Sequence, residues 1–225
     1  MNRALPQHIG AVLFDMDDTL VDSEQAWFDA TRQLWEEYEV PKVFDDDVSD
    51  ELRGGTIEDV VAVFSRVYPG VEPDVAERRM LQLLQEHLAD GVEPMPGAEA
   101  LLEALSGTIP LAVASNSPSA IVKATMQSLG WQRYFVAMLG TEDVERPKPA
   151  PDLYLAAAER CGVVPEHCVV MEDSRTGATA AREAGAFVVA VGPFAADLGH
   201  VHMPSLDHPM LQSWQPQPIA HAKEL

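Results

Sequence analysis

The chain has 225 residues, of which 47% are hydrophobic and 23% are charged. These proportions are typical of a folded protein with one large or two modest domains, and they exclude a largely disordered chain. The 36 acidic side chains, against 15 Lys and Arg, give a formal net charge of −21. A surface this acidic repels phosphate backbones and anionic lipid headgroups, so we expect no nucleic-acid partner and no membrane association.

Cys161 and Cys168 are the two cysteines of the chain. Two cysteines do not make a disulfide scaffold, and this pair does not have CxxC spacing, so we expect a reducing compartment. No apolar run reaches the roughly 18 residues that a membrane span needs. The N-terminus lacks the apolar stretch of a signal peptide. The sequence therefore predicts a cytoplasmic protein.

The first structural signal is the short apolar run at residues 9–14, which predicts a buried strand ending at Asp15. The pattern then changes to helices. Apolar and aromatic side chains recur at helical spacing after Ser23, and two more amphipathic helices are predicted at 56–67 and 73–88. We therefore expect an all-helical segment after the first strand.

After residue 91, short apolar runs alternate with helical patterns. Strands are predicted at 111–114, 136–139, 168–171 and 187–191, with helices at 98–105, 118–129, 152–160 and 176–184. The polar, proline-containing residues 214–225 predict a frayed tail. The alternation predicts an α/β fold: a doubly wound, Rossmann-like parallel-sheet core with an inserted α-helical cap domain. The expected core comprises residues 1–22 and 94–225, and the expected cap comprises residues 23–93.

Polar side chains follow three of the predicted strands, where each strand ends: Asp15 and Asp17, Ser115 and Asn116, and Glu172 and Asp173. The carboxyl ends of parallel strands meet at one edge of a sheet, where ligands bind. Lys148 stands between Pro147 and Pro149, which pre-set its backbone. We therefore expect these side chains to converge on one site.

The residue types indicate the chemistry of that site. Crowded carboxylates repel one another and require a cation, and oxygen ligands without His or Cys suit Mg²⁺. A carboxylate can attack phosphorus as a nucleophile, and a second carboxyl group nearby can protonate a leaving alcohol and later activate water. A serine hydroxyl, a backbone N–H and a lysine can hold phosphoryl oxygens.

Four motifs in order carry a resemblance to a known family: FDMDDTLVDSE (14–24), VASNS (113–117), RPKPAPDLY (146–154) and VMEDSRTGATAAREAG (170–185). With them, the chain resembles the haloacid dehalogenase-like hydrolase superfamily over residues 9–192. It is most similar to the subgroup with a small helical cap, which includes phosphoglycolate phosphatases and β-phosphoglucomutases. Residues 94–97, Pro-Met-Pro-Gly, look like the family's hinge between cap and core.

The resemblance implies a role for each matching residue. Asp15 would be the nucleophile and Asp17 the general acid/base. Ser115 and the Asn116 N–H would hold the phosphoryl group, and Lys148 would neutralise its charge. Magnesium would be bound by Asp15, by the backbone carbonyl of Asp17, by Asp173, and by Glu172 either directly or through water.

Two cap residues are candidates for substrate specificity. Arg53 matches a cap loop where relatives place a basic substrate-contacting residue. Trp27 occupies a position where the sugar phosphomutases of the family carry an acid/base histidine, and it either faces the substrate or packs within the cap. Because tryptophan cannot move a proton, the phosphomutase alternative loses support.

The resemblance implies Mg²⁺-dependent hydrolysis of a small phosphomonoester, of the sugar phosphate or phosphoglycolate type, through an aspartyl-phosphate intermediate. The partner would be a small phosphorylated metabolite, and the protein a monomer or homodimer. Three alternatives remain: a phosphomutase, a dehalogenase, or a catalytically silent phosphoester-binding module. Dehalogenases of the family lack a second aspartate like Asp17, which favours phosphoryl transfer.

Overall fold

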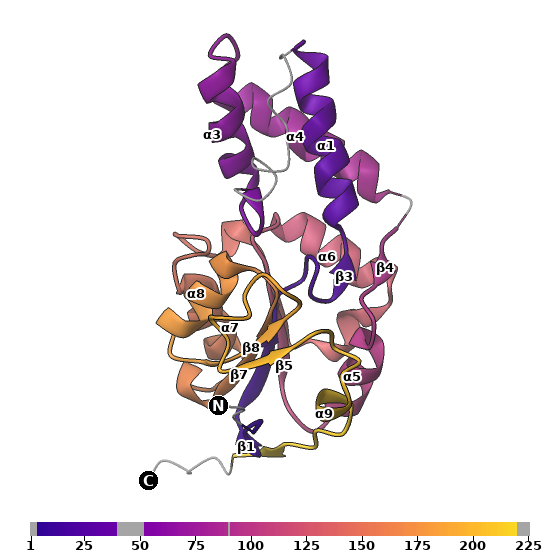
Figure 1. Cartoon of the computed structure of the whole chain (residues 1–225), viewed down its shortest axis with the longest axis vertical. Helices are drawn as coiled ribbons and strands as arrows, with labels where there is room; N and C mark the ends of the chain where they lie inside the picture. Colours follow the sequence, from indigo (N-terminus) through magenta and orange to yellow (C-terminus); the bar gives the residue numbers. More distant parts are fainter. Residues whose placement is uncertain (1–3, 40–51, 90, 220–225) are drawn as a thin grey trace.

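The computed structural model describes residues 4–39, 52–89 and 91–219 (Figure 1). Its centre is a six-stranded sheet in the order β6-β5-β2-β7-β8-β9, with every neighbouring pair parallel. The strands are β2 (Ala11–Phe14), β5 (Leu111–Ala114), β6 (Ala137–Leu139), β7 (Cys168–Glu172), β8 (Phe187–Val191) and β9 (Val201–Met203). The predicted strand-helix alternation thus forms a parallel sheet.

Helices cover both faces of this sheet. Successive strand residues alternate between two hydrophobic clusters: Phe14 packs in one with residues of α5 (Ala98–Leu105) and α6 (Ser119–Ser128). Leu13 packs in the other with residues of α7 (Asp152–Arg160) and α8 (Arg175–Glu183). Strands buried on both faces explain the nearly continuous apolar runs in the sequence. The predicted doubly wound α/β fold is confirmed.

Within the described residues, three helices stand above the carboxyl end of the sheet: α1 (Glu24–Glu37), α3 (Ile57–Val67) and α4 (Pro73–Leu88) (Figure 1). We call them the helical insert. Their apolar faces pack together, and the rings of Trp35 and Phe64 meet edge to face at 5.0 Å. Thr56 caps α3: its hydroxyl accepts the Asp59 N–H, while the Asp59 carboxylate accepts the Thr56 N–H. The expected helices at 56–67 and 73–88 are thus present.

The two chain crossings between the insert and the sheet lie side by side. Two short strands, β3 (Val21–Asp22) and β4 (Glu93–Pro94), pair antiparallel there. The predicted boundaries, 22/23 and 93/94, fall within this pair. Division of the chain into a core and a cap domain at these points stays a prediction, and residues 40–51 and 90 of the expected cap lie outside the described part.

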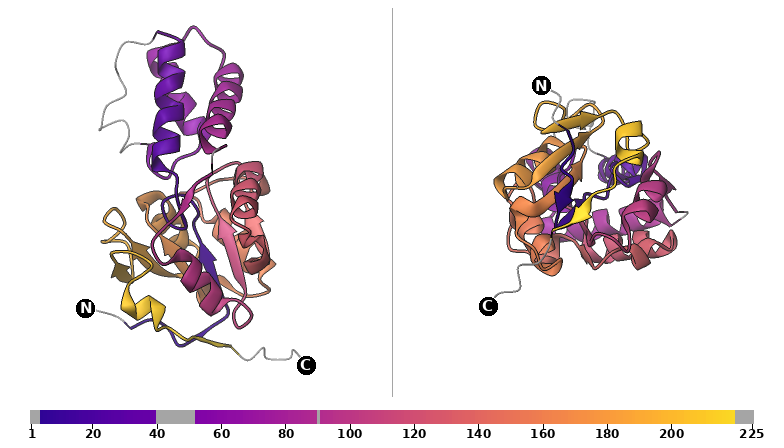
Figure 2. Two further views of the ribbon diagram at one scale, coloured as in Figure 1. Left: turned by 90° about the vertical axis from the view of Figure 1, so that its right-hand side faces the viewer. Right: turned by 90° about the horizontal axis from the view of Figure 1, so that it is seen from below.

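The C-terminal segment differs from the prediction of a frayed tail. β10 (Gln217–Pro218) pairs with β1 (His8–Ile9) at the end of the molecule opposite the helical insert (Figure 2). Trp214 is buried, and its indole N–H donates to the Pro6 carbonyl at 2.8 Å. The prediction was wrong for residues 214–219, because strands of two residues are too short to give a periodic signal; residues 220–225 are not described. The prediction also missed β9, a strand of three residues.

The remaining short elements are α9 (Pro209–Gln212) and three 3₁₀ turns: η1 (Trp131–Tyr134), η2 (Thr141–Asp143) and η3 (Pro165–His167). Among the described helices, none combines the length and apolar character that crossing a bilayer requires.

Close packing of α8 against β7 requires a glycine. A Cβ placed on Gly177 would lie 1.4 Å from Oε1 of Glu172, the fully buried last residue of β7. We expect Gly177→Ala to lower the free energy of unfolding by about 1–3 kcal/mol, the usual cost of overpacking. Urea denaturation followed by circular dichroism measures this cost.

Gly70→Ala provides the matched control, because a Cβ there meets its nearest neighbour at an ordinary 3.5 Å. Equal stability changes in the two variants would contradict the packing of Gly177 against Glu172.

Candidate active site

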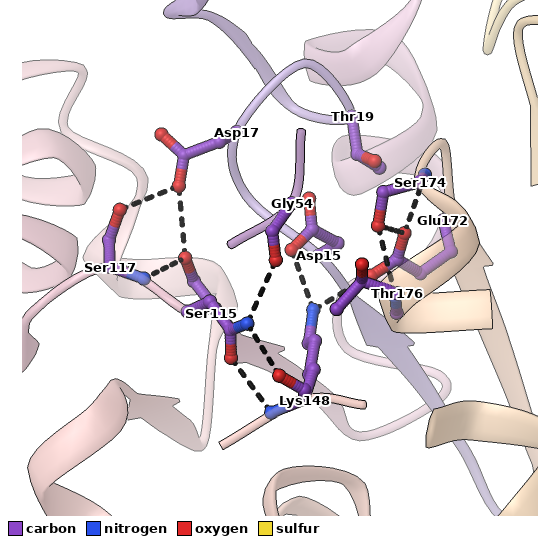
Figure 3. Close-up of polar contacts among 12 residues, drawn as sticks. Asp15, Asp17, Thr19, Gly54, Ser115, Ser117, Lys148, Glu172, Ser174 and Thr176 are labelled. Carbon is purple, nitrogen blue, oxygen red and sulfur yellow. Dashed lines mark hydrogen bonds and ion pairs between the residues drawn. The ribbon is translucent and has the colours of Figure 1, made fainter. Parts of the chain in front are cut away.

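Five of the predicted site residues appear at the carboxyl edge of the sheet in Figure 3: Asp15, Asp17, Ser115, Lys148 and Glu172. Asp15 directly follows β2, and its N–H donates to the Met171 carbonyl of β7 at 3.0 Å. Ser115 directly follows β5, and its N–H donates to the Leu139 carbonyl of β6 at 3.1 Å. Both backbones therefore stay within the sheet's hydrogen-bonding pattern, which fixes the points from which the side chains leave.

A buried lysine joins two of these carboxylates. The Lys148 ammonium lies 2.7 Å from Oδ1 of Asp15 and 2.8 Å from Oε1 of Glu172. Only 3% of Lys148 is exposed. Burial lowers the pKa of Lys148, but attraction to the two carboxylates outweighs it and the pKa lies above its usual value. Lys148 is therefore a fixed positive charge at this edge.

Asn116 holds the backbone of Lys148 in place. Its side-chain oxygen accepts the Lys148 N–H at 2.9 Å, and its side-chain nitrogen donates to the Lys148 carbonyl at 3.0 Å. The same nitrogen donates to the Gly54 carbonyl of the insert at 2.8 Å. Gly54 has a φ of +71°, and a Cβ there would approach the Ser174 Cβ to 2.7 Å. The insert loop can therefore rest this closely on the sheet edge only with glycine at position 54.

Glu172 is fully buried, and both of its oxygens are occupied by protein donors. Oε1 accepts from Lys148 and from the Tyr154 hydroxyl, which lies at 3.0 Å. Oε2 accepts from the Ser174 N–H and hydroxyl, both at 2.9 Å. Burial raises the pKa of Tyr154 well above its usual value, so this hydroxyl keeps its proton and donates it in the hydrogen bond.

Three carboxylates gather around the lysine. Oxygens of Asp15, Glu172 and Asp173 lie within 4.8 Å of one another, and Asp173 also accepts the Thr19 hydroxyl at 3.1 Å. Burial and repulsion from neighbouring carboxylates raise the pKa of Asp173. Burial also raises the pKa of Asp15, although Lys148 opposes the shift. Three carboxylates against one ammonium leave two negative charges to compensate, and this oxygen-only donor set fits a divalent cation such as Mg²⁺.

The Asp17 carboxylate points away from that cluster, toward the loop after β5 (Figure 3). Its Oδ2 accepts the hydroxyls of Ser115 at 2.9 Å and Ser117 at 2.8 Å. Its Oδ1 accepts the Ser23 hydroxyl at 2.7 Å and the Trp27 indole N–H at 3.2 Å. Two donors thus come from the sheet edge and two from the start of the insert.

Asp18 joins this edge to the first helix of the insert. Its carboxylate accepts the N–H groups of Ser23 and Glu24, at the N-terminus of α1. Burial, together with repulsion from Asp17 and Glu24, raises the pKa of Asp18 to about 7. Arg53 lies across the same helix end: it forms an ion pair with Glu24, and its guanidinium lies over the Phe194 ring at 3.9 Å.

A pocket opens between the insert and the sheet edge. All the predicted site residues line this pocket except Glu172, which is fully buried. Trp27, Phe28, Leu52 and Val60 contribute an apolar wall from the insert, opposite the charged groups of the sheet edge. The structure therefore brings the sequence-predicted residues together around one cavity.

Several residues of this site were missed at the sequence level: Ser117, Tyr154, Ser174 and Gly177. Each lies inside one of the four quoted motifs, so the signal was present. Tyr154 is on the buried face of α7, which helical spacing could have indicated. The hydrogen bonds from Ser117 to Asp17 and from Tyr154 to Glu172 connect segments far apart in the chain, and no local pattern reveals them.

Comparison with known proteins agrees with this geometry. The sequence profile of the haloacid dehalogenase-like hydrolases matches residues 12–191. The chain is 33% identical over 180 residues to the fructose-1-phosphate phosphatase YqaB of Escherichia coli, covering 80% of this chain and 94% of that protein. It is 30% identical over 177 residues to a phosphorylated carbohydrates phosphatase of Thermotoga maritima, covering 78% and 81% of the two chains.

Among solved structures, the fold is similar to that of CbbY from Rhodobacter sphaeroides in complex with phosphate. The TM-score is 0.77 at 26% identity, over 88% of this chain and 94% of that one. The sequence match and the shared fold both span most of the chain, and the chain therefore belongs to the haloacid dehalogenase-like hydrolase family.

Proposed function

We propose that this protein is a Mg²⁺-dependent phosphatase that hydrolyses a small phosphomonoester through an aspartyl-phosphate intermediate. The observation that carries the proposal is the pair of carboxylates in one loop, with Asp15 against the Lys148 ammonium and Asp17 held among neutral donors. In this proposal, Asp15 acts as the nucleophile and Asp17 exchanges a proton. Phosphatases among the relatives support it.

In the first step, an Asp15 carboxylate oxygen attacks phosphorus and the bond from phosphorus to the ester oxygen breaks. Asp17 gives its proton to the departing oxygen, so an alcohol leaves and an acyl phosphate remains on Asp15. The Ser115 hydroxyl, the Asn116 N–H and Lys148 hold the phosphoryl oxygens. Ser115 donates to Asp17 in this structure, so it would exchange that acceptor for the phosphoryl group.

In the second step, Asp17 accepts a proton from a water molecule that attacks phosphorus. The bond between phosphorus and Asp15 breaks, and inorganic phosphate leaves. Asp15 and Asp173 would hold Mg²⁺, with the Asp17 carbonyl and with Glu172 directly or through water. When bound, the ion supplies positive charge that offsets the carboxylates and the phosphoryl oxygens.

The other enzyme classes have less support. A dehalogenase of this family has no need of Asp17. A phosphomutase would need an acid/base group on the first insert helix, where this chain has Trp27. The names of the relatives point to sugar phosphates as the first substrates to test. The free thiols of Cys161 and Cys168 are consistent with a cytoplasmic enzyme. The proposed enzyme is a monomer or a homodimer.

Phosphate release from p-nitrophenyl phosphate and a panel of sugar phosphates tests the proposal. We expect Mg²⁺-dependent release that EDTA abolishes. Asp15→Asn should lower kcat by on the order of a thousandfold or more, because the attacking oxygen is lost. Asp74→Asn, an exposed aspartate of α4, is the matched control. A folded wild-type protein that releases no phosphate from any ester would sink the proposal.

Metal binding can be tested without turnover, through the melting temperature. We expect Mg²⁺ to raise Tm of the wild type, because a ligand at 100 times its Kd stabilises by about 2.7 kcal/mol. Asp173→Asn should remove this rise. Without Mg²⁺, the same variant should melt at or above the wild-type Tm, because it removes a charge that burial and repulsion disfavour. If Mg²⁺ raised Tm of Asp173→Asn by as much as it raised Tm of the wild type, the ion would bind elsewhere.

A further inference from the structure

Asp17, the proposed acid/base, accepts four hydrogen bonds, and one of the four donors differs from the other three. The Ser23, Ser115 and Ser117 hydroxyls can rotate, and each can either donate or accept a hydrogen bond. The Trp27 indole N–H, 3.2 Å from Oδ1 of Asp17, can only donate, and its direction is fixed by the ring. The two oxygens of Asp17 are therefore not equivalent.

The backbone of α1 holds Trp27 in place. The Trp27 N–H donates to the Ser23 carbonyl at 3.1 Å, and the Trp27 carbonyl accepts the Thr31 hydroxyl at 2.8 Å. The ring is half-buried and lines the pocket. Trp27 is on the insert and Asp17 in the loop after β2, so the contact forms only when α1 stands over the sheet edge.

We propose that Trp27 is a positioning residue that determines which oxygen of Asp17 carries the catalytic proton. This inference rests on the proposed function. If Oδ1 carried the proton, the donor-only indole N–H would have to donate to a hydroxyl oxygen, which is a weaker acceptor than an unprotonated carboxyl oxygen, and the Ser23 hydroxyl would have to turn to accept the proton. The proton therefore resides on Oδ2, the oxygen that faces Ser115 and Ser117 and thus the proposed phosphoryl position. From Oδ2 the proton passes to the departing ester oxygen, while Oδ1 keeps its hydrogen bond from the Trp27 indole.

The requirement for that proton depends on the leaving group. Nitrophenolate departs readily as an anion, whereas phenolate and especially an alkoxide need protonation as they leave. The variant to test is Trp27→Phe, which keeps an aromatic ring in the apolar wall and removes the N–H donor. The measurement is kcat and KM for p-nitrophenyl, phenyl and propyl phosphates with saturating Mg²⁺.

We expect the ratio of kcat/KM for p-nitrophenyl phosphate to kcat/KM for propyl phosphate to be about 10- to 100-fold higher in Trp27→Phe than in the wild type, because kcat/KM includes only the steps up to departure of the leaving group. This is part of the 10²–10⁴-fold that general acid catalysis contributes. The matched control is Trp35→Phe on the same helix, whose ring packs against Phe64 inside the insert. A loss of packing alone would change the three kcat/KM values by the same factor.

An unchanged ratio in folded Trp27→Phe would overturn the inference, whatever the absolute rates. That result is distinguishable from failure of the proposed function, in which the wild type itself releases no phosphate and both proposals fall. Should Trp27→Phe not fold, ¹⁵N-tryptophan spectra give a second test. One of the four indole signals should move in Asp17→Asn, and four unmoved signals would contradict the contact.

Discussion

The buried ammonium of Lys148 is the interaction on which the rest of this site depends. It lies between Asp15 and Glu172, where water is excluded and an unpaired charge would be costly. Breaking a buried ion pair by removing one partner typically costs about 3–5 kcal/mol. The lysine therefore allows two carboxylates to stand together at the sheet edge. With Asp173 beside them, the remaining negative charge is the reason that the site suits a divalent cation.

The second constraint is that the partners of the lysine come from separate segments. Asn116 holds the Lys148 backbone on one side and the Gly54 carbonyl of the insert on the other. Glu172 is held in turn by Tyr154 and Ser174. Through Asn116, hydrogen bonds thereby connect the insert to the loop that carries the lysine. Glu172 is best understood as a structural anchor as well as a candidate metal ligand.

Much of the fold could be predicted from the sequence, because strands buried on both faces appear as apolar runs and the motifs mark where three of them end. The pairing of Gln217–Pro218 with His8–Ile9 could not be predicted, because a strand of two residues is too short to show an alternation of apolar and polar side chains. In the site, residue types indicated which side chains converge. The orientation of Asp17 toward Ser117 and Trp27 was not predictable, because it depends on contacts between distant segments.

The most direct measurement of the central claim is chemical trapping of the intermediate on Asp15. The enzyme is quenched in acid during turnover, reduced with borohydride and digested. Mass spectrometry then locates homoserine, the product of reducing an aspartyl phosphate. The account predicts homoserine at position 15, present with substrate and Mg²⁺ and absent when EDTA is added. Phosphate release with no modification at Asp15, or with modification at another residue, would contradict it.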